Sequence, residues 1–338
     1  MCGIAGFIHL NNQSVEGGSK ILTCMGELLA HRGPDGEGSW LDDSGKVGLA
    51  HRRLAIIDLS SSGAQPMKGR DGTLITLNGE IYNYLELQES LRGSWDFTSD
   101  SDTETVLASY DRYGEECVDH LRGMFSFAIW DDRKQRLFCA RDRFGIKPFY
   151  YTTVDDVFYF ASEAKALLPV LLDIETDGEA MAEYLTFNFV IGENTLFKGI
   201  KQLLPGHGLM IKGGEVRTWR YWDVNYEVDW DHGEGWFQER LRSLLDDSIG
   251  VHLRSDVPVG AYLSGGIDSS LMAILAARKD SQNREAFHGR FLEYPGYDES
   301  NFAEMASEAI GGNLNVIDIT HKDFEENFRK VIYHLDYP

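Results

Sequence analysis

The sequence has few cysteines and no long apolar run, and each shortage narrows the class of protein. Its four cysteines are Cys2, Cys24, Cys117 and Cys139, and no secretory signal accompanies them. Reduced thiols are therefore expected rather than disulfides. No segment is long enough for a membrane-spanning helix, and the opening MCGIAGFIHL lacks the basic region of a signal peptide. We predict a cytoplasmic protein with no membrane partner.

Basic residues are also scarce. The chain has 32 Lys and Arg against 54 Asp and Glu, for a formal net charge of −22. This balance argues against nucleic acid as a partner, because binding to phosphates needs clustered cations. Hydrophobic residues make up 43% of 338 residues, which is enough for a large core. A chain of this length suggests two domains, since single cores stop growing at about 250–300 residues.

The residue pattern changes character near residue 222. Residues 2–222 show mostly short apolar strands with Gly-rich turns and two helical stretches, 21–30 and 103–113, and Ser101 or Asp102 is the expected N-cap of the second. The acidic segment 223–235 is interpreted as a linker. In residues 236–338 strands alternate with helices, which predicts a parallel sheet with helices on both faces. The expected elements are helices near 236–253, from 268 and at 300–310, and strands at 259–263, 286–291 and 315–319.

The first chemical signal is Cys2, which follows the initiator methionine. Removal of Met1 is normal before a small residue and would leave Cys2 with a free α-amine. The ordinary pKa of an α-amine is about 7.7–8.0, so this group can accept the proton of the thiol and no separate histidine is needed. We therefore predict that Cys2 is an N-terminal nucleophile.

Several motifs support this prediction together. CGIAGF is followed by HRGPDGEG, AHRRLAIID, LNGEIYNY, SDSDTETVL, LRGMFSFAIWD and RDRFGIKPFYY. In this order they resemble the glutaminase half of the glutamine-hydrolysing asparagine synthetases. The resemblance implies a class II amidotransferase domain at 2–222. Its fold would be the α+β N-terminal-nucleophile sandwich, with two antiparallel sheets between helical layers (αββα).

The resemblance also implies roles for residues around Cys2. Arg53 matches the arginine that holds the carboxylate of glutamine, and a guanidinium suits that group. Asp102 matches the carboxylate that holds its ammonium, with Glu80 in contact range. The side chain of Asn78 and the backbone N–H of Gly79 match the oxyanion donors. The remaining expected contacts are Leu54 and Ile56 in the pocket and Arg32 behind Cys2, whereas RDRFGIKP (141–148) is interpreted as architecture.

A second signal is the segment AYLSGGIDSS at 261–270, where an apolar strand ends in a Gly-rich turn that opens a helix. Backbone N–H groups and a helix N-terminus make an anion site. Asp268 beside a phosphate requires a bridging cation, so Mg²⁺ is implied, although no set of protein side chains forms a metal site by itself. The segment lacks the ending of a Walker A loop.

This second segment resembles the PP-loop of enzymes that cut ATP between its α and β phosphates. The resemblance implies an α/β parallel-sheet ATP pyrophosphatase domain at 236–338, which we expect to be incomplete because family members run beyond about 500 residues and this chain stops before the second nucleotide loop. The expected ATP contacts are Leu263, Ser264, Gly265, Gly266, Asp268, Ser269, Ser270 and Gly289.

Together the two signals predict a glutamine-dependent amidotransferase with ATP and Mg²⁺ as cofactors. Cys2 would release ammonia from L-glutamine, and ammonia would amidate a carboxylate activated as an acyl-adenylate. L-Aspartate, giving asparagine, is the leading acceptor, and another carboxylate, such as a surface sugar acid or a secondary metabolite, is the alternative. The chain as given is expected to act as a glutaminase alone, and a homodimer is compatible with the resemblance.

Two other classes of protein are disfavoured. Glucosamine-6-phosphate synthases and amidophosphoribosyltransferases share the N-terminal nucleophile, but the segment SGGIDSS argues against both. A non-catalytic regulator with a degraded site is disfavoured because Cys2, Arg53, Asn78, Gly79 and Asp102 are all intact.

Overall fold

The computed structural model describes residues 1–279, 285–293 and 296–337. The chain divides into two compact units, Met1–Asn225 and Tyr226–Pro338. The domain bounds expected from the sequence, with a linker at 223–235, stay a prediction. Among the described residues, no helix combines the length and the apolar character needed to cross a bilayer.

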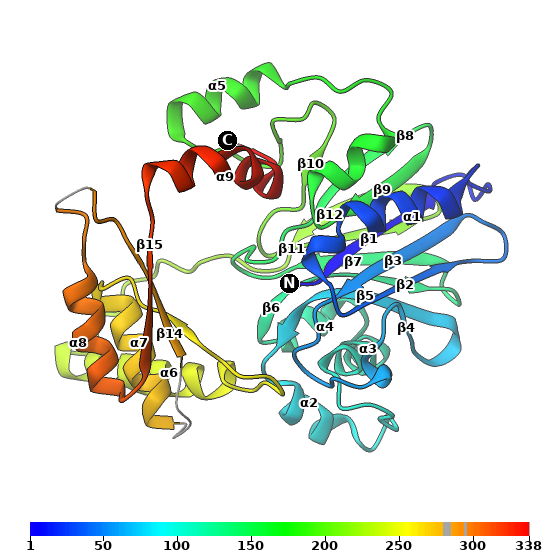
Figure 1. Ribbon diagram of the computed structural model, residues 1–338. Helices are drawn as coiled ribbons and strands as arrows, with labels where there is room; N and C mark the ends of the chain where they lie inside the picture. The colour runs from blue at the N-terminus through cyan, green and yellow to red at the C-terminus, as the bar shows by residue number, and fades with distance from the viewer. Residues whose placement is uncertain (280–284, 294–295, 338) are drawn as a thin grey trace. The chain divides into compact units, whose positions relative to one another are not determined.

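The first unit contains two six-stranded antiparallel sheets (Figure 1). The first has the order β10-β8-β9-β1-β3-β2 and the second the order β12-β11-β7-β6-β5-β4. The strands of the first sheet are β1 (Gly3–His9), β2 (Gly36–Leu41), β3 (Val47–Arg53), β8 (Tyr150–Val154), β9 (Val157–Ala161) and β10 (Lys201–Gln202). Those of the second are β4 (Met67–Lys68), β5 (Thr73–Ile81), β6 (Gly123–Asp131), β7 (Arg136–Arg141), β11 (His207–Lys212) and β12 (Glu215–Arg220).

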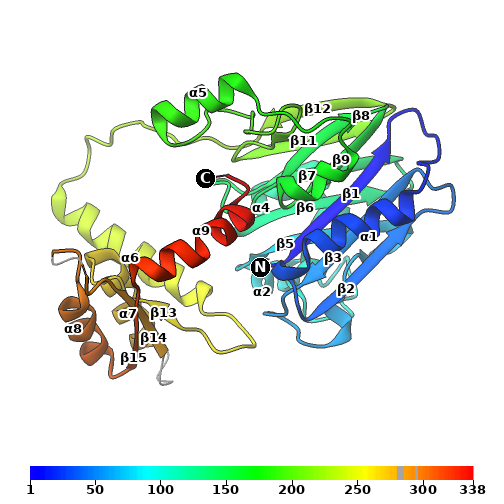
Figure 2. The same ribbon diagram turned by 45° about the horizontal axis from the view of Figure 1, so that its top comes forward.

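Three apolar cores show that this unit is layered. One core lies between the sheets, with Phe158 from the first and Trp130 from the second. A second core joins the first sheet to α1 (Gly18–Leu28), which lies beside β1 and β3 in Figure 2. A third joins the second sheet to α2 (Tyr84–Leu91), α3 (Asp102–Tyr113) and α4 (Cys117–His120). Both sheets are therefore covered on both faces, and every residue of β1 is buried. The order helix, sheet, sheet, helix is the architecture predicted for residues 2–222.

The helical prediction for this unit is only partly confirmed. The two expected helices are present as α1 and α3, and the side chain of Ser101 accepts a hydrogen bond from the backbone N–H of Thr103 as the N-cap of α3. The sequence interpretation missed α2, α4 and α5 (Gly178–Phe187). Of these, α2 closely follows the long strand β5 and has no side-chain N-cap. Because no capping residue marks where the helix begins, the sequence does not distinguish it from the end of the strand.

The second unit alternates strands and helices as predicted. Its strands form a parallel sheet in the order β13-β14-β15. A small core joins Leu263 and β14 to α7 and α8, through Ala273, Ala286 and Ala303. The elements are α6 (Glu234–His252), β13 (Ala261–Tyr262), α7 (Ile267–Lys279), β14 (Glu285–Arg290), α8 (Ser300–Ile310), β15 (Asn313–Asp318) and α9 (His321–Leu335). The strand expected at 259–263 is shorter than predicted, and α9 was missed. Helices on both faces of this sheet stay a prediction.

Candidate active site

Cys2 directly precedes β1, a strand that is paired on both sides. The backbone N–H of Leu54 donates to its Sγ at 3.4 Å, and the thiol donates to the Leu54 carbonyl at 3.6 Å. Burial is the main cause that raises the pKa of the Cys2 thiol. A thiol in this state needs a base before it can act as a nucleophile near neutral pH.

The amine that faces this thiol belongs to Met1. Burial lowers the pKa of that α-amine, and the nearby charges of Arg32 and Lys147 act in the same direction, against Cys2 and Glu80. A lowered pKa increases the fraction of neutral amine, which is the form that accepts a proton. Removal of Met1 would move the free α-amine to Cys2, whose carbonyl is held by Arg32.

The side chains expected to bind glutamine surround a small cavity of about 20 Å³ next to Cys2. This volume is little more than one water molecule needs. The wall includes all the glutaminase residues predicted from the sequence except Asn78, together with others, and consists of Cys2, Arg53, Leu54, Ile56, Ile57, Gly63, Gln65, Leu77, Gly79, Glu80, Ser101, Asp102 and Thr103. The structure brings these positions together, and their individual roles stay predictions.

Asn78 and Gly79 lie side by side on β5, opposite Ser126 and Phe125 of β6. The Asn78 side chain is fully buried, and neither its nitrogen nor its oxygen has a hydrogen-bond partner in the described part of the chain. Buried polar groups nearly always have partners, so this one calls for an explanation. A Cβ at Gly79 would lie 2.3 Å from the carbonyl oxygen of Met124. Only glycine therefore fits at the predicted oxyanion donor.

Two carboxyl groups lie at the same cavity. Burial, followed by the charge of Asp102, raises the pKa of Glu80 to about 8. Burial also raises the pKa of Asp102 to about 6, although its Oδ2 accepts a hydrogen bond from the backbone N–H of Ile81 at 2.8 Å. Such raised values mark carboxyl groups that are poised to receive a cation.

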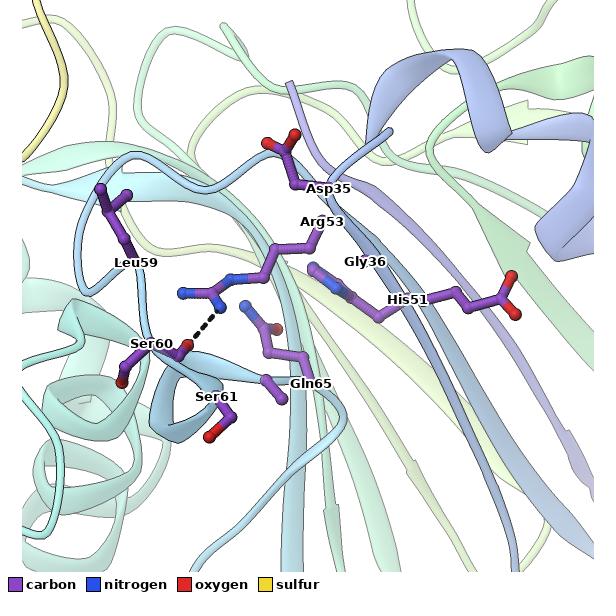
Figure 3. A pocket seen from close by; sticks show the side chains of 10 residues that line it. Asp35, Gly36, His51, Arg53, Leu59, Ser60, Ser61 and Gln65 are labelled. Carbon is purple, nitrogen blue, oxygen red and sulfur yellow. Dashed lines mark hydrogen bonds between the residues drawn. The ribbon is translucent and has the colours of Figure 1, made fainter.

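Arg53 lies at the end of β3 and lines both this cavity and a larger one of about 250 Å³. Its guanidinium donates to the carbonyl of Ser60 at 2.8 Å, the dashed line in Figure 3, and to the carbonyls of Ile57 and Asp58. The guanidinium is thus held by the loop that follows β3. A substrate carboxylate would have to share these donors with the loop carbonyls.

Sequence reasoning missed three residues that support this site. Buried Gln65 accepts from the backbone N–H of Leu77 at 2.6 Å and donates to the hydroxyl of Thr103 at 3.1 Å. Burial lowers the pKa of buried Lys147, and the charges of Glu80, Arg32 and Cys2 also act on it. Glu163 binds Arg32 behind Cys2. Lys147 stands in the segment interpreted as architecture, and its side chain contributes to the charge of the site.

Architecture is still the main role of that segment. The carboxylate of Asp142 accepts hydrogen bonds from the backbone N–H groups of Phe125, Phe144, Ile146 and Lys147. The Arg141 guanidinium donates to three backbone carbonyls, those of Lys147, Gly145 and Leu203.

In the second unit, a turn joins β13 to α7 at the predicted anion site. The backbone N–H of Gly266 donates to Ser264 Oγ at 3.2 Å, and that of Ser264 donates to Ser269 Oγ at 3.2 Å. Gly265 has φ +92°, a left-handed conformation that glycine adopts at little cost. The turn is therefore built by its own serines and glycines, with the start of α7 directly behind it.

Next to this turn lies a cavity of about 450 Å³. Leu263, Ser264, Ser269 and Gly289 line it, whereas Gly265, Gly266, Asp268 and Ser270 do not. The other lining residues are Tyr262, Phe287, His288, Phe291, Tyr297 and Glu299. Within the described ranges, no group of three or more His, Cys, Asp or Glu could hold a metal ion. An exposed Asp268 in the first turn of α7 fits a Mg²⁺ whose other ligands come from a nucleotide and water.

Two family models match different parts of the chain. Residues 1–222 match the family model for a glutamine amidotransferase domain, and residues 240–338 match that for asparagine synthase. A structure of glutamine phosphoribosylpyrophosphate amidotransferase from Bacillus subtilis covers 96% of this chain and is itself covered to 70%, with 15% identity and a TM-score of 0.49.

The curated relatives are similar over the whole chain. "Asparagine synthetase [glutamine-hydrolyzing] 1" of Bacillus subtilis is 39% identical, and the chain covers 53% of its length. "Amidase chry2" of Gibberella zeae is 33% identical, with 54% covered. "Putative asparagine synthetase [glutamine-hydrolyzing] 2" of Methanocaldococcus jannaschii is 32% identical, with 68% covered. The chain thus spans about half the length of the first two and about two thirds of the third. It belongs to the family of glutamine-hydrolysing asparagine synthetases, with a glutamine amidotransferase domain followed by an asparagine synthase segment.

Proposed function

We propose that the chain releases ammonia from glutamine at Cys2 and that the ammonia amidates a carboxylate activated with ATP. The observation that carries this proposal is the gathering of Cys2, Gly79, Arg53 and the Glu80–Asp102 pair around one cavity. These groups match the thiol, oxyanion donor, cation and anions that an amino acid amide requires.

The chemistry follows from these positions. The α-amine of Cys2 takes the thiol proton, and Sγ attacks the amide carbon of glutamine. The backbone N–H of Gly79 and the otherwise unpartnered Asn78 amide stabilise the oxyanion. The C–N bond breaks as the amine returns a proton to the leaving ammonia. Water then cleaves the thioester and releases glutamate.

In the second unit, the turn after β13 would hold the phosphates of ATP at the N-terminus of α7, with the N–H groups that now donate to serine hydroxyls within the turn turning to the phosphates. Asp268 would hold Mg²⁺, which neutralises phosphate charge. An acceptor carboxylate would displace pyrophosphate and form an acyl-adenylate, and ammonia would then displace AMP. Aspartate is our leading acceptor because of the relatives named asparagine synthetases. The relative named an amidase favours keeping another carboxylate as the alternative. The homodimer and the cytoplasmic location stay predictions from the sequence.

The test of the glutaminase is to incubate the chain with glutamine and to measure glutamate and ammonia. Mass spectrometry should show that Met1 is absent. Cys2→Ala should abolish the release of ammonia, and so should an uncleaved peptide ahead of Cys2, because it removes the free amine. Full activity with Met1 retained would contradict the proposal.

The ligase part has a separate readout. With ATP, Mg²⁺ and aspartate added, pyrophosphate and asparagine are measured alongside glutamate. A panel of other carboxylates in place of aspartate identifies the acceptor. Glutamate without pyrophosphate for any acceptor would limit the function of this chain to the glutaminase.

A further inference from the structure

A cluster of buried charged side chains lies directly behind the nucleophile, and its centre is Glu163. Glu163 Oε1 accepts hydrogen bonds from Arg32 Nη1 at 2.8 Å and His31 Nε2 at 3.1 Å, and Oε2 binds the ammonium of Lys165. Arg32, Glu163 and Lys165 are each at least nine-tenths buried. Burial acts to raise the pKa of Glu163, but the hydrogen bonds from Lys165 and Arg32 outweigh it and lower the net value. Glu163 is therefore an ionised carboxylate shared among several donors.

A single hydrogen bond, from Arg32 to the backbone of Cys2, links this cluster to the nucleophile. Arg32 Nε donates to the carbonyl oxygen of Cys2 at 2.8 Å, so the same guanidinium holds Glu163 on one edge and Cys2 on the other. The residue before Glu163 holds a nearby residue of β1: Ile4 N–H donates to Ser162 Oγ at 3.0 Å, and Ser162 N–H donates to the Ile4 carbonyl at 2.9 Å. The segment after β9 thus fixes the start of β1 at two points.

We propose that Glu163 is a positioning residue of the glutaminase, which orients Arg32 so that Arg32 fixes the carbonyl of Cys2 and with it the thiol and the α-amine. This inference rests on the proposed function of Cys2. Without Glu163, the long Arg32 side chain would keep its charge but lose the partner that sets its direction. A misplacement of about 1 Å at a reacting group costs up to about a hundredfold in rate.

We also expect Glu163 to act on the charges around Cys2 indirectly, through its bond to Arg32. The groups that face the α-amine are the cations Arg32 and Lys147, which lower its pKa, and the acidic groups Cys2 and Glu80, which raise it. Asp102 and Glu80 act on the thiol. The negative charge of Glu163 partly offsets the charges of Arg32 and Lys165. Removing it should therefore lower the pKa of both the amine and the thiol.

The experiment compares Glu163→Gln with Glu175→Gln. Glu175 is a matched control because it forms an ion pair with Lys198 at 2.6 Å in which both side chains are more than half exposed. Two quantities are measured: kcat and KM for glutamine, and the pH dependence of Cys2 alkylation by iodoacetamide without glutamine, quantified by peptide mass spectrometry. For Glu163→Gln we expect kcat to fall about ten- to a hundredfold with KM nearly unchanged, and the alkylation midpoint to move to lower pH. Glu175→Gln should match the wild type in both.

A double variant tests whether Glu163 acts through Arg32. In an Arg32→Gln background, adding Glu163→Gln should cause little further loss of kcat, since the link is already broken. If the double variant loses kcat by the product of the two single losses, the proposal is overturned. It is also overturned if Glu163→Gln folds and keeps the wild-type kcat and the wild-type midpoint of Cys2 alkylation. If Glu163→Gln does not fold, Glu163→Asp keeps the charge but shortens the reach, and it should lower kcat without moving the midpoint. A wild type that releases no ammonia would count against the proposed function, and the alkylation comparison would still decide the role of Glu163.

Discussion

Glu80 and Asp102 face the same cavity, and the charge of Asp102 adds to burial in raising the pKa of Glu80 to about 8. The ammonium of glutamine would favour the ionised form of both groups. We therefore expect KM for glutamine to fall as the pH rises from about 6 to about 8, with proton release on binding. In Glu80→Gln the upper part of this dependence should vanish. Steady-state kinetics between about pH 5.5 and 9 check this, and a variant with the pH profile of the wild type would contradict it.

The same pair affects stability. The folded pKa of Glu80 lies above the ordinary glutamate value of 4.5, so the folded state holds a proton that the unfolded state has lost. Glu80 therefore lowers stability progressively as the pH rises from 4.5 to about 8. Glu80→Gln should melt at a higher temperature than the wild type at about pH 8, by roughly 2–4 °C for each kcal/mol regained. Equal melting temperatures of the two proteins at all pH values would refute this.

Arg53 is expected to serve both the loop and the substrate. Arg53→Ala should lower kcat/KM for glutamine about ten- to a hundredfold, because a charge-assisted contact is worth roughly 1.5–3 kcal/mol. It should also lower the melting temperature, since the carbonyls of Ile57 and Ser60 lose their donor. Arg53→Lys keeps the charge without the planar fork and should recover only part of either loss. An Arg53→Ala variant with wild-type kcat/KM would exclude Arg53 from binding.

Gln65 ties the strand of Asn78 to the helix of Asp102, through the residues next to each. Gln65→Leu leaves a buried N–H and a buried hydroxyl without partners, which should cost about 1–3 kcal/mol in the free energy of unfolding. Gln65→Glu can still accept from Leu77 but cannot donate to Thr103 when ionised. Its loss of stability should therefore grow with pH in denaturant titrations. A loss that does not depend on pH would show that the Thr103 contact contributes little.

Replacing Gly79 tests whether the backbone at the predicted oxyanion donor has to stay close to the neighbouring strand. An added Cβ would meet the Met124 carbonyl oxygen at 2.3 Å and Phe125 Cα at 2.7 Å. Because both are backbone atoms of the neighbouring strand, Gly79→Ala should separate β5 from β6, with loss of ammonia release and a lower melting temperature. Gly93→Ala is the control, since a Cβ there meets nothing within 4 Å. Similar behaviour of the two variants would mean that the strands tolerate the substitution.

Much of the site could be anticipated because the sequence carries its chemistry in short motifs. The sequence alone shows a cysteine next to the initiator methionine, an arginine, a glycine after Asn78 and an acidic residue at a helix start, and the fold places Cys2, Arg53, Gly79 and Asp102 around one cavity. Gln65 and Glu163 could not be found this way. Their contacts join segments far apart in the chain, and the Arg32–Glu163 bond spans 131 positions. The Arg32–Glu163 contact depends on the pairing of β1 with β9, which periodicity does not reveal.

The starts of the helices were also only partly predictable from the sequence. The helix α3 was predictable because Ser101 caps it in the usual way. The helix α9 carries a complete capping box, with Thr320 and Asp323 bonded to each other, yet was missed because its N3 residue is Asp rather than the usual Glu or Gln. The shorter extent of β13 reflects its pairing with β14 over only Ala261 and Tyr262.

Chain ends usually fray, but β1 is held by β3 on one side and β9 on the other. Ordering a backbone costs roughly 1–2 kcal/mol per residue, and here folding has met that cost before any substrate arrives. Cys2 directly precedes this strand, so we expect it to keep its place until the sheet itself melts. On heating, glutaminase activity and the β-sheet signal of the first unit should disappear together, rather than activity first.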